Sequence, residues 1–173
     1  MLMHQGIGLE VFNAMPMRRA VHAVYECCYS VPLAADVARA RPYADHDALF
    51  READALLFGL GEDSIDTILQ AYPDIGRRPG SEKSAAEQCA IWCDQPEVME
   101  QLATASKRYL EHFGFGFVMF INGYEAGQVL ATMTDRLHND IETERKIVRN
   151  ELARINRTRL ERMLGPEGGY DNW

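Results

Sequence analysis

The order of apolar and polar positions along the chain predicts an all-helical protein. Apolar residues recur three and four positions apart in almost every segment, which places them on one face of a helix. The first long helix would be capped by Asn13, with Pro16 in its first turn, where a missing backbone N–H does no harm. Its inner face would consist of Val21, Val24, Tyr25 and Cys28.

Prolines, glycines and capping residues divide the rest of the chain into further helices. We expect these to run from Ser30 to about Ala40, Asp45 or Asp47 to Gly59, about Asp63 to Pro73, Ser84 to about Asp94, Pro96 to Phe113, Tyr124 to Leu137 and about Ile141 to Leu164. The apolar run 115–121 has strand-forming residues but no partner strand, so we interpret it as a buried extended segment or a helix start. The predicted fold class is all-α, an irregular single-domain bundle of seven to eight helices.

Length, charge and cysteine content narrow the class of protein. A chain of 173 residues suits one domain, and we expect a helical domain at 9–164 between flexible segments at 1–8 and 165–173. The net charge of −8 argues against nucleic acid or a membrane as partner, but a small anionic substrate remains compatible if a buried arginine receives it. The start lacks signal-peptide features and the cysteines lack disulfide or zinc spacing, so we expect a cytoplasmic protein.

The first candidate site is the loop that begins at Tyr72 and Pro73. Proline restricts the backbone there, and the tyrosine stands at the exit of a helix. One interpretation is a helix stop with a packed tyrosine. The other is a phenol placed to donate a hydrogen bond or a proton.

A second candidate is the segment Ser84-Ala85-Ala86-Glu87-Gln88, which has the form of a capping box. Glu87 could simply bind the backbone amide of Ser84. Alternatively, Glu87 and Gln88 could line a polar pocket together with the free N–H groups of the first turn, which suits an anionic or carbonyl-rich ligand.

The last predicted helix contributes Arg159, which falls on an apolar stripe with Val148, Leu152, Ile155 and Met163. An arginine in this position either snorkels from the edge or pairs with a buried anion. The other charges of this helix alternate in sign, and we interpret them as a solvated face: Glu142, Glu144, Arg145, Lys146, Arg149, Glu151, Arg154, Glu161 and Arg162. The five histidines have no metal-ligand spacing, so no metal site is expected.

Over residues 9–164 the chain resembles the 2-oxo-4-hydroxy-4-carboxy-5-ureidoimidazoline (OHCU) decarboxylases, which form allantoin in the last step of urate oxidation. The motifs that carry the resemblance are Phe12-Asn13-Ala14, Cys27-Cys28 with Ser30, Arg41-Pro42-Tyr43-Ala44-Asp45, Pro73 with Ile75-Gly76, Ser84 to Gln88, Phe113-Gly114-Phe115 with Phe117, Arg136-Leu137 with Asn139-Asp140, and Arg159-Leu160. Their order within one helical domain is more specific than any single motif.

The resemblance implies a cofactor-independent decarboxylase, an all-α fold and a homodimer. It implies that Pro73 and the segment Ser84, Ala85, Ala86 and Gln88 bind the substrate, with Glu87 as the acid/base or orienting carboxylate. It also implies that Arg159 holds an anionic or carbonyl group, and that backbone contacts come from Phe117, Val118, Met119, Phe120 and Ile121.

The chain departs from this family at Tyr72, where the family has its proton-donating histidine. An imidazole exchanges protons near pH 7, whereas an ordinary phenol has a pKa of about 10. A phenol can still polarise a carbonyl or protonate a strongly basic carbanion. Three hypotheses follow: a decarboxylase for a related oxo or imino acid, an OHCU decarboxylase with an unusual donor, or a scaffold used for cyclisation, isomerisation or binding alone.

Overall fold

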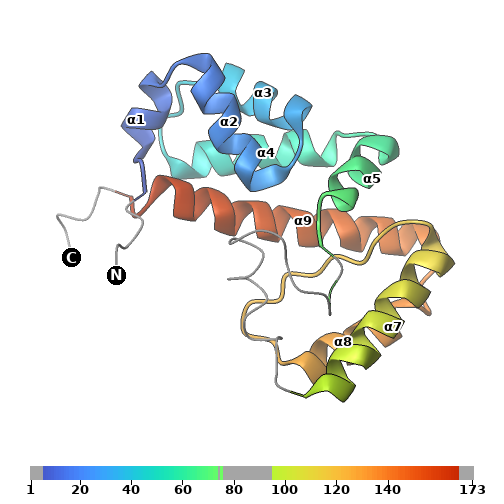
Figure 1. Cartoon of the computed structure of the whole chain (residues 1–173). Helices are drawn as coiled ribbons and strands as arrows, with labels where there is room; N and C mark the ends of the chain where they lie inside the picture. The colour runs from blue at the N-terminus through green and yellow to red at the C-terminus, as the bar shows by residue number, and fades with distance from the viewer. Residues whose placement is uncertain (1–5, 74, 76–94, 168–173) are drawn as a thin grey trace. The chain divides into compact units, whose positions relative to one another are not determined.

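The computed structural model describes residues 6–73, 75 and 95–167 (Figure 1). Eight helices and no strand are present in these ranges, which confirms the all-α fold predicted from the sequence. The helices, labelled as in Figure 1, are α1 (Leu9–Ala14), α2 (Met17–Cys28), α3 (Val31–Arg39), α4 (His46–Phe58), α5 (Glu62–Gln70), α7 (Pro96–Phe113), α8 (Ala126–Arg136) and α9 (Ile141–Leu164). The chain divides into two compact units, residues 1–64 with 153–173 (unit 1) and residues 65–152 (unit 2).

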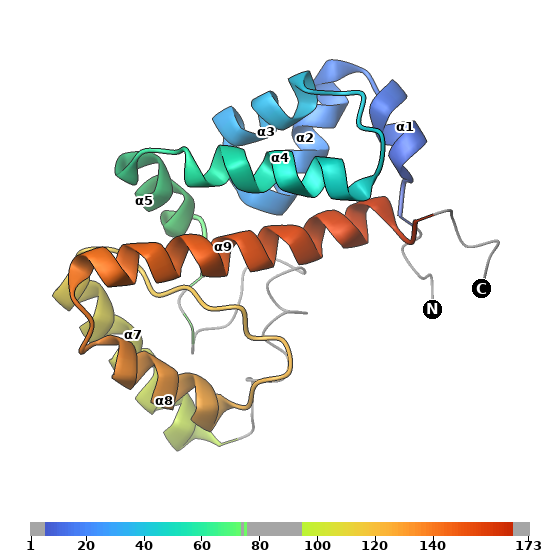
Figure 2. The same ribbon diagram turned by 180° about the vertical axis from the view of Figure 1, so that it is seen from behind.

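Unit 1 is built on consecutive helices, in which α3 packs against both α2 and α4 (Figures 1 and 2). Its core contains side chains that are at most 2% exposed, namely Phe12, Leu33, Val37, Leu49 and Leu57. The C-terminal half of α9 also belongs to this unit. The backbone N–H groups of Ile7 and Gly8 donate to the carbonyls of Met163 and Leu164, both at 2.8 Å, and so attach the start of the unit to the end of α9.

Two helices of unit 1 begin where the sequence predicts. Ser30 caps α3, because its Oγ accepts a hydrogen bond from the Leu33 N–H at 3.3 Å. Asp45 caps α4 in the same way through the Ala48 N–H at 2.7 Å. Of the two starts expected for this helix, Asp45 is therefore the right one.

The role expected of Asn13 is wrong. Asn13 lies inside α1, and α2 begins after Pro16 without a side-chain cap. The Asn13 amide instead pairs with the backbone of Tyr43, accepting from its N–H and donating to its carbonyl, both at 2.9 Å. Arg41 donates to the carbonyls of Phe12 at 2.6 Å and Met15 at 2.7 Å. These hydrogen bonds between residues far apart in the sequence attach α1 to the segment 41–43. They also satisfy backbone N–H and carbonyl groups that would otherwise need partners close in the sequence.

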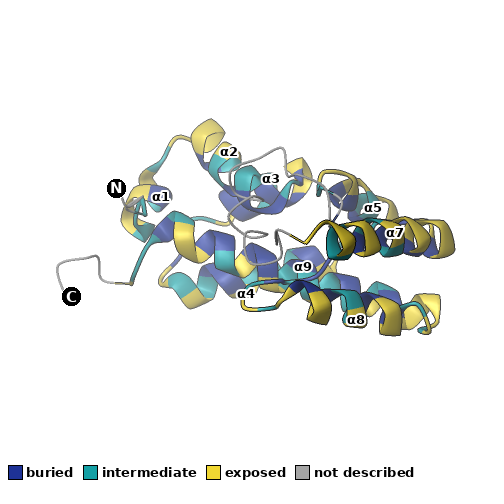
Figure 3. Cartoon of the chain, turned by 60° about the horizontal axis from the view of Figure 1, so that its bottom comes forward, coloured by how far each residue is buried: buried dark blue, intermediate teal, exposed yellow. Residues whose placement is uncertain are grey.

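Unit 2 contains α7 packed against α8, together with the first half of α9. Its fully buried side chains include Leu102, Tyr109, Val129, Met133 and Leu152. In Figure 3 the helices have one buried and one exposed face, as the apolar periodicity predicts. α7 ends at Gly114, whose φ of 81° lies in the left-handed region that favours glycine.

The apolar run 115–121 is neither helix nor strand. Phe115, Phe117, Val118, Met119 and Ile121 are each at most 9% exposed. Of the two interpretations given above, a buried segment outside any helix is therefore confirmed, and a helix start is wrong, because α8 starts only at Ala126.

Candidate active site

Tyr72 stands just beyond α5, where the sequence predicts the helix to stop. The helix ends at Gln70, and the Tyr72 N–H donates to the Leu69 carbonyl at 3.2 Å to close a turn. Tyr72 and Pro73 are half-buried, and the hydroxyl oxygen of Tyr72 is shielded from solvent. A shielded phenol at the start of a loop can donate a hydrogen bond or a proton to a bound ligand.

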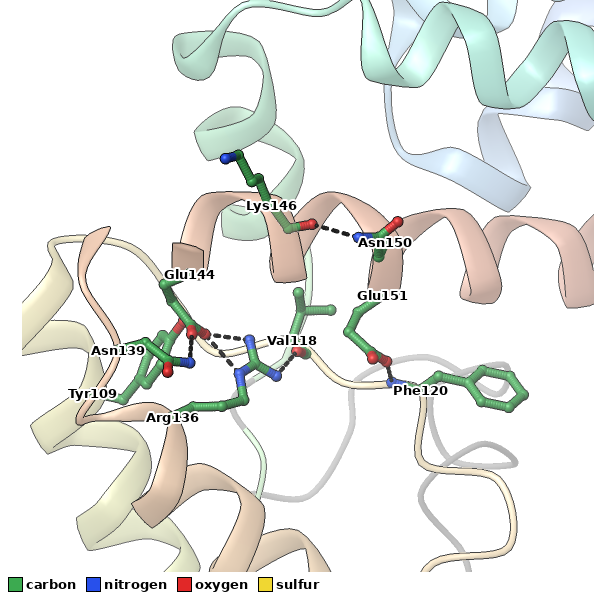
Figure 4. A network of polar contacts seen from close by, with 9 residues as sticks. All are labelled: Tyr109, Val118, Phe120, Arg136, Asn139, Glu144, Lys146, Asn150 and Glu151. Atoms are coloured by element: carbon green, nitrogen blue, oxygen red, sulfur yellow. Dashed lines mark hydrogen bonds and ion pairs between the residues drawn. The ribbon is translucent and has the colours of Figure 1, made fainter. Parts of the chain in front are cut away.

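Two charged side chains hold the segment 117–121 by its backbone (Figure 4). Nη1 of Arg136, at the end of α8, donates to the Val118 carbonyl at 2.8 Å. The Phe120 N–H donates to Oε2 of Glu151, on α9, at 2.7 Å. Both are charge-assisted hydrogen bonds, the stronger kind in proteins. Within the described ranges the N–H and carbonyl of Met119, between these two anchors, make no hydrogen bond.

Arg136 is itself held by a buried network centred on Glu144 (Figure 4). The Glu144 carboxylate is 0% exposed and accepts hydrogen bonds from Arg136 Nε at 2.6 Å, from Asn139 Nδ2 at 3.1 Å and from the Tyr109 hydroxyl. Burial and the hydrogen bond to Glu144 raise the pKa of Tyr109 well above its ordinary value. A buried ion pair with several additional hydrogen bonds has one favoured geometry, so the guanidinium of Arg136 is fixed in direction.

Aromatic side chains of the segment 115–117 pack around this network. The rings of Tyr109 and Phe117 meet edge to face, with centroids 5.1 Å apart, and Arg136 Cζ lies 4.3 Å from the Phe117 centroid. Cζ of Arg145, which is ion-paired with Asp66, lies 4.0 Å from the Phe115 centroid. The side chains of Phe115 and Phe117 are occupied by these packing contacts. A ligand that approaches this segment would therefore contact its backbone.

Arg159 lies in unit 1 and faces inward. It is 3% exposed, its Nη1 donates to the Cys27 carbonyl at 3.4 Å, and its Cζ lies 4.8 Å from the centroid of the Tyr29 ring. The alternative in which Arg159 snorkels to solvent is therefore wrong. A buried guanidinium is a positive charge that can receive a carboxylate or another anionic oxygen.

The thiol near this guanidinium is a poor nucleophile. Burial raises the pKa of Cys28 to about 11, although the backbone of Ser30 and the charge of Arg159 act in the opposite direction. Its Sγ donates to the Ser30 carbonyl at 3.5 Å. Because reactive cysteines need a lowered pKa, Cys28 serves packing here.

The residues that the sequence suggests for the site belong to different units of the chain. Tyr72, Pro73 and the segment 117–121 belong to unit 2, whereas Arg159 belongs to unit 1. The other suggested residues lie outside the described ranges, namely Ser84, Ala85, Ala86, Glu87 and Gln88.

The interpretation of Glu144 and Glu151 as part of a solvated helix face is wrong. Glu144 is fully buried, and Glu151 is half-buried and bound to the backbone of Phe120. The register of α9 contained a signal for the first of them, because Glu144 lies four residues before Val148 on the stripe that leads to Arg159. The role of Glu151 depends on a segment 31 residues away, which the helical periodicity does not reveal.

Neither metal binding nor membrane insertion is indicated in the ranges that the structure describes. No group of three or more His, Cys, Asp or Glu side chains there is arranged to hold a metal ion. No described helix is at once long enough and apolar enough to cross a bilayer.

Comparison with known proteins identifies relatives over most of the chain. The sequence profile of the OHCU decarboxylase family matches residues 13–161. An OHCU decarboxylase of Haloferax volcanii is 27% identical over 95% of this chain and 100% of its own length. One from Halalkalicoccus jeotgali is 30% identical over 59% of this chain, and that match spans 60% of the relative, less than two thirds. A uric acid degradation bifunctional protein of Bacillus sp. TB-90 is 25% identical over 72% of this chain and 25% of its own length.

Two solved structures have the same fold. A crystal structure of OHCU decarboxylase in the presence of (S)-allantoin has a TM-score of 0.73 at 21% identity, covering 81% of this chain and 95% of that one. A structure of (S)-allantoin synthase has a TM-score of 0.72 at 15% identity, covering 91% of this chain and 54% of that one. The profile match alone spans well over half of the sequence, and the shared fold agrees with it. The chain therefore belongs to the OHCU decarboxylase family, a family of carboxy-lyases, and resembles these decarboxylases over most of its length.

Proposed function

We propose that this protein decarboxylates OHCU, or a small polar oxo or imino acid closely related to it, without a cofactor. The single observation that carries the proposal is the nearly complete burial of Arg159 in a chain of this family. A buried guanidinium binds a carboxylate or another anionic oxygen through charge-assisted hydrogen bonds, which are the stronger kind in proteins.

The chemistry needs no metal or cofactor when the substrate itself accepts the electrons. The bond between the ring carbon and the carboxylate breaks, carbon dioxide leaves, and the electron pair passes into the adjacent C=N and carbonyl groups of the ring. The carbanion is then protonated on one face. The protein must orient the carboxylate, stabilise the developing negative charge and deliver that proton.

We assign these tasks to residues by family resemblance and by their surroundings. Arg159 binds the anionic oxygens, and Tyr72 delivers the proton from its shielded hydroxyl. Glu87 is the acid/base or orienting carboxylate, and the neighbouring residues Ser84, Ala85, Ala86 and Gln88 bind the substrate. Pro73 lines the pocket.

The segment from Phe117 to Ile121 contributes backbone hydrogen bonds in this proposal. Its Val118 carbonyl and Phe120 N–H are already used by Arg136 and Glu151. The peptide groups of Met119, which lie between these two anchors, are our candidates in this segment for binding a ureido or carbonyl group.

We also propose that the protein is a cytoplasmic homodimer. The dimer rests on the family resemblance, and the compartment on the acidic composition and the buried thiols of Cys27 and Cys28. Sedimentation equilibrium at micromolar concentration checks the dimer, since a monomeric mass there would contradict it.

Freshly generated OHCU offered to the purified protein tests the proposal. We expect carbon dioxide release well above the spontaneous rate and accumulation of one allantoin enantiomer, followed by circular dichroism. Arg159→Gln should raise KM at least tenfold, because a charge-assisted contact to a substrate anion is worth about 1.5–3 kcal/mol. Arg162→Gln is the matched control, since this arginine is exposed on the same helix, and it should leave KM unchanged.

Two results would contradict the proposal. Wild-type protein that releases carbon dioxide no faster than buffer is not an OHCU decarboxylase, and the same assay with related oxo and imino acids then decides whether it decarboxylates any of them. Equal KM values for Arg159→Gln and Arg162→Gln would remove Arg159 from the substrate site.

A further inference from the structure

Tyr29 is a conformational outlier. It follows the last residue of α2 with φ 54° and ψ 27°, in the left-handed region. Among the non-glycine residues in the described ranges it alone has a positive φ. Glycine is the usual residue at this position after a helix, because any side chain there brings Cβ too close to the backbone.

The backbone conformation of Tyr29 places its ring against Arg159. The guanidinium Cζ lies 4.8 Å from the ring centroid, within the range of a cation–π contact. The Tyr25 ring meets the Tyr29 ring edge to face at 6.3 Å and supports it from within α2. Arg159 thus has its Cζ over an aromatic ring and donates from Nη1 to the Cys27 carbonyl at 3.4 Å.

Stability alone does not explain a tyrosine at this position. The free-energy cost of the left-handed conformation for a bulky residue is of the same size as the gain from one cation–π contact, so the two approximately cancel. Strained residues of this kind concentrate at functional sites, where another requirement keeps them. The group that Tyr29 contacts is the buried arginine assigned above to the substrate anion.

We propose that Tyr29 is a positioning residue that holds the guanidinium of Arg159 in the orientation that binds the anionic group of the substrate. An aromatic ring next to Cζ of a guanidinium accepts none of its N–H groups in conventional hydrogen bonds. The ring can therefore restrict the orientation of the guanidinium without competing with oxygens for its hydrogen bonds. This inference rests on the proposed function, since it concerns the same arginine.

Three variants test it: Tyr29→Gly, which removes both the strain and the ring, Tyr29→Phe, which keeps the ring, and Tyr29→Gly combined with Arg159→Gln. We expect Tyr29→Gly to raise KM for OHCU about fivefold or more, with kcat within about twofold of wild type. Its melting temperature should change little, because the strain that is removed and the cation–π contact that is lost approximately cancel. Tyr29→Phe should retain the wild-type KM, and the glycine substitution should have no further effect on KM once Arg159 is replaced.

The outcomes separate this inference from the proposed function. If the wild type is active and Tyr29→Gly has the same KM as wild type, the inference is wrong. The inference is also wrong if Tyr29→Gly raises KM by the same factor in the Arg159→Gln background as in wild type. An inactive wild type overturns the proposed function instead. Crystal structures of wild type and Tyr29→Gly then decide the inference, which stands if the guanidinium of Arg159 changes its plane and fails if it does not.

Discussion

Replacing Glu144 by glutamine tests the buried network that holds the segment 117–121. Glu144 is 0% exposed and forms an ion pair with Arg136 at 2.5 Å, in addition to its bonds with Asn139 and Tyr109. Glutamine has nearly the same shape but no negative charge. It would leave the guanidinium of Arg136 buried without a counter-charge, because that side chain is only 7% exposed.

The expected loss of stability is large. Removing one partner of a buried ion pair costs about 3–5 kcal/mol, a substantial part of the roughly 5–15 kcal/mol that stabilises a typical domain. For a protein of this size each kcal/mol corresponds to about 2–4 °C, so the melting temperature should fall by about 6–20 °C. Glu142→Gln is the matched control on the same helix, where an exposed pair with Lys146 at 3.0 Å contributes at most about 1 kcal/mol.

Differential scanning calorimetry of the two variants at neutral pH measures the difference. The reasoning predicts that Glu144→Gln melts well below Glu142→Gln, which should stay within about 4 °C of wild type. Two variants that melt within about 2 °C of each other would refute the view that the carboxylate of Glu144 holds this unit together.

Three further predictions concern single side chains. Glu151→Leu removes the acceptor of the Phe120 N–H and should raise KM for OHCU about fivefold or more, while Glu151→Gln, which keeps an acceptor oxygen, should recover most of the loss. Burial, and to a smaller extent the negative charge of Glu52, raises the pKa of the Tyr43 hydroxyl to about 12. As the pH rises, the unfolded chain therefore loses this proton at a lower pH than the folded protein does. The unfolding free energy, measured in urea, should therefore fall between pH 10 and 12, less steeply in Tyr43→Phe; equal slopes would contradict this. Cys28 should resist iodoacetamide at pH 8 in native protein but react in urea, as read by peptide mass, and equal reactivity would contradict its burial.

The sequence predicted much of the helical architecture because local signals dominate there. Ser30 and Asp45 cap helices through contacts three residues away, and α9 runs over the full span that its periodic pattern indicates. The stop before Pro73 and the left-handed end at Gly114 are also local properties of proline and glycine.

The parts of the site that the sequence did not reveal depend on contacts between distant residues. Glu144 lies in a helix with the composition of a surface helix, but its register places it among core positions. The pairing with Arg136 explains how its charged carboxylate can be buried there. Glu151 meets Phe120 across 31 positions. The strained backbone of Tyr29 has no signature in a sequence pattern, because aromatic residues at a helix end usually adopt ordinary conformations.

The role proposed for Tyr72, delivery of the proton in a decarboxylation, can be tested by replacing it with phenylalanine. Carbon dioxide release and allantoin handedness would be measured under single-turnover conditions with OHCU, with Tyr124→Phe as a control outside the proposed site. Loss of a proton donor typically costs about 10²–10⁴ in rate. We expect the rate to fall at least about a hundredfold in Tyr72→Phe with loss of product handedness, and partial activity in Tyr72→His. A Tyr72→Phe variant that releases carbon dioxide at the wild-type rate and makes the same enantiomer would contradict this role.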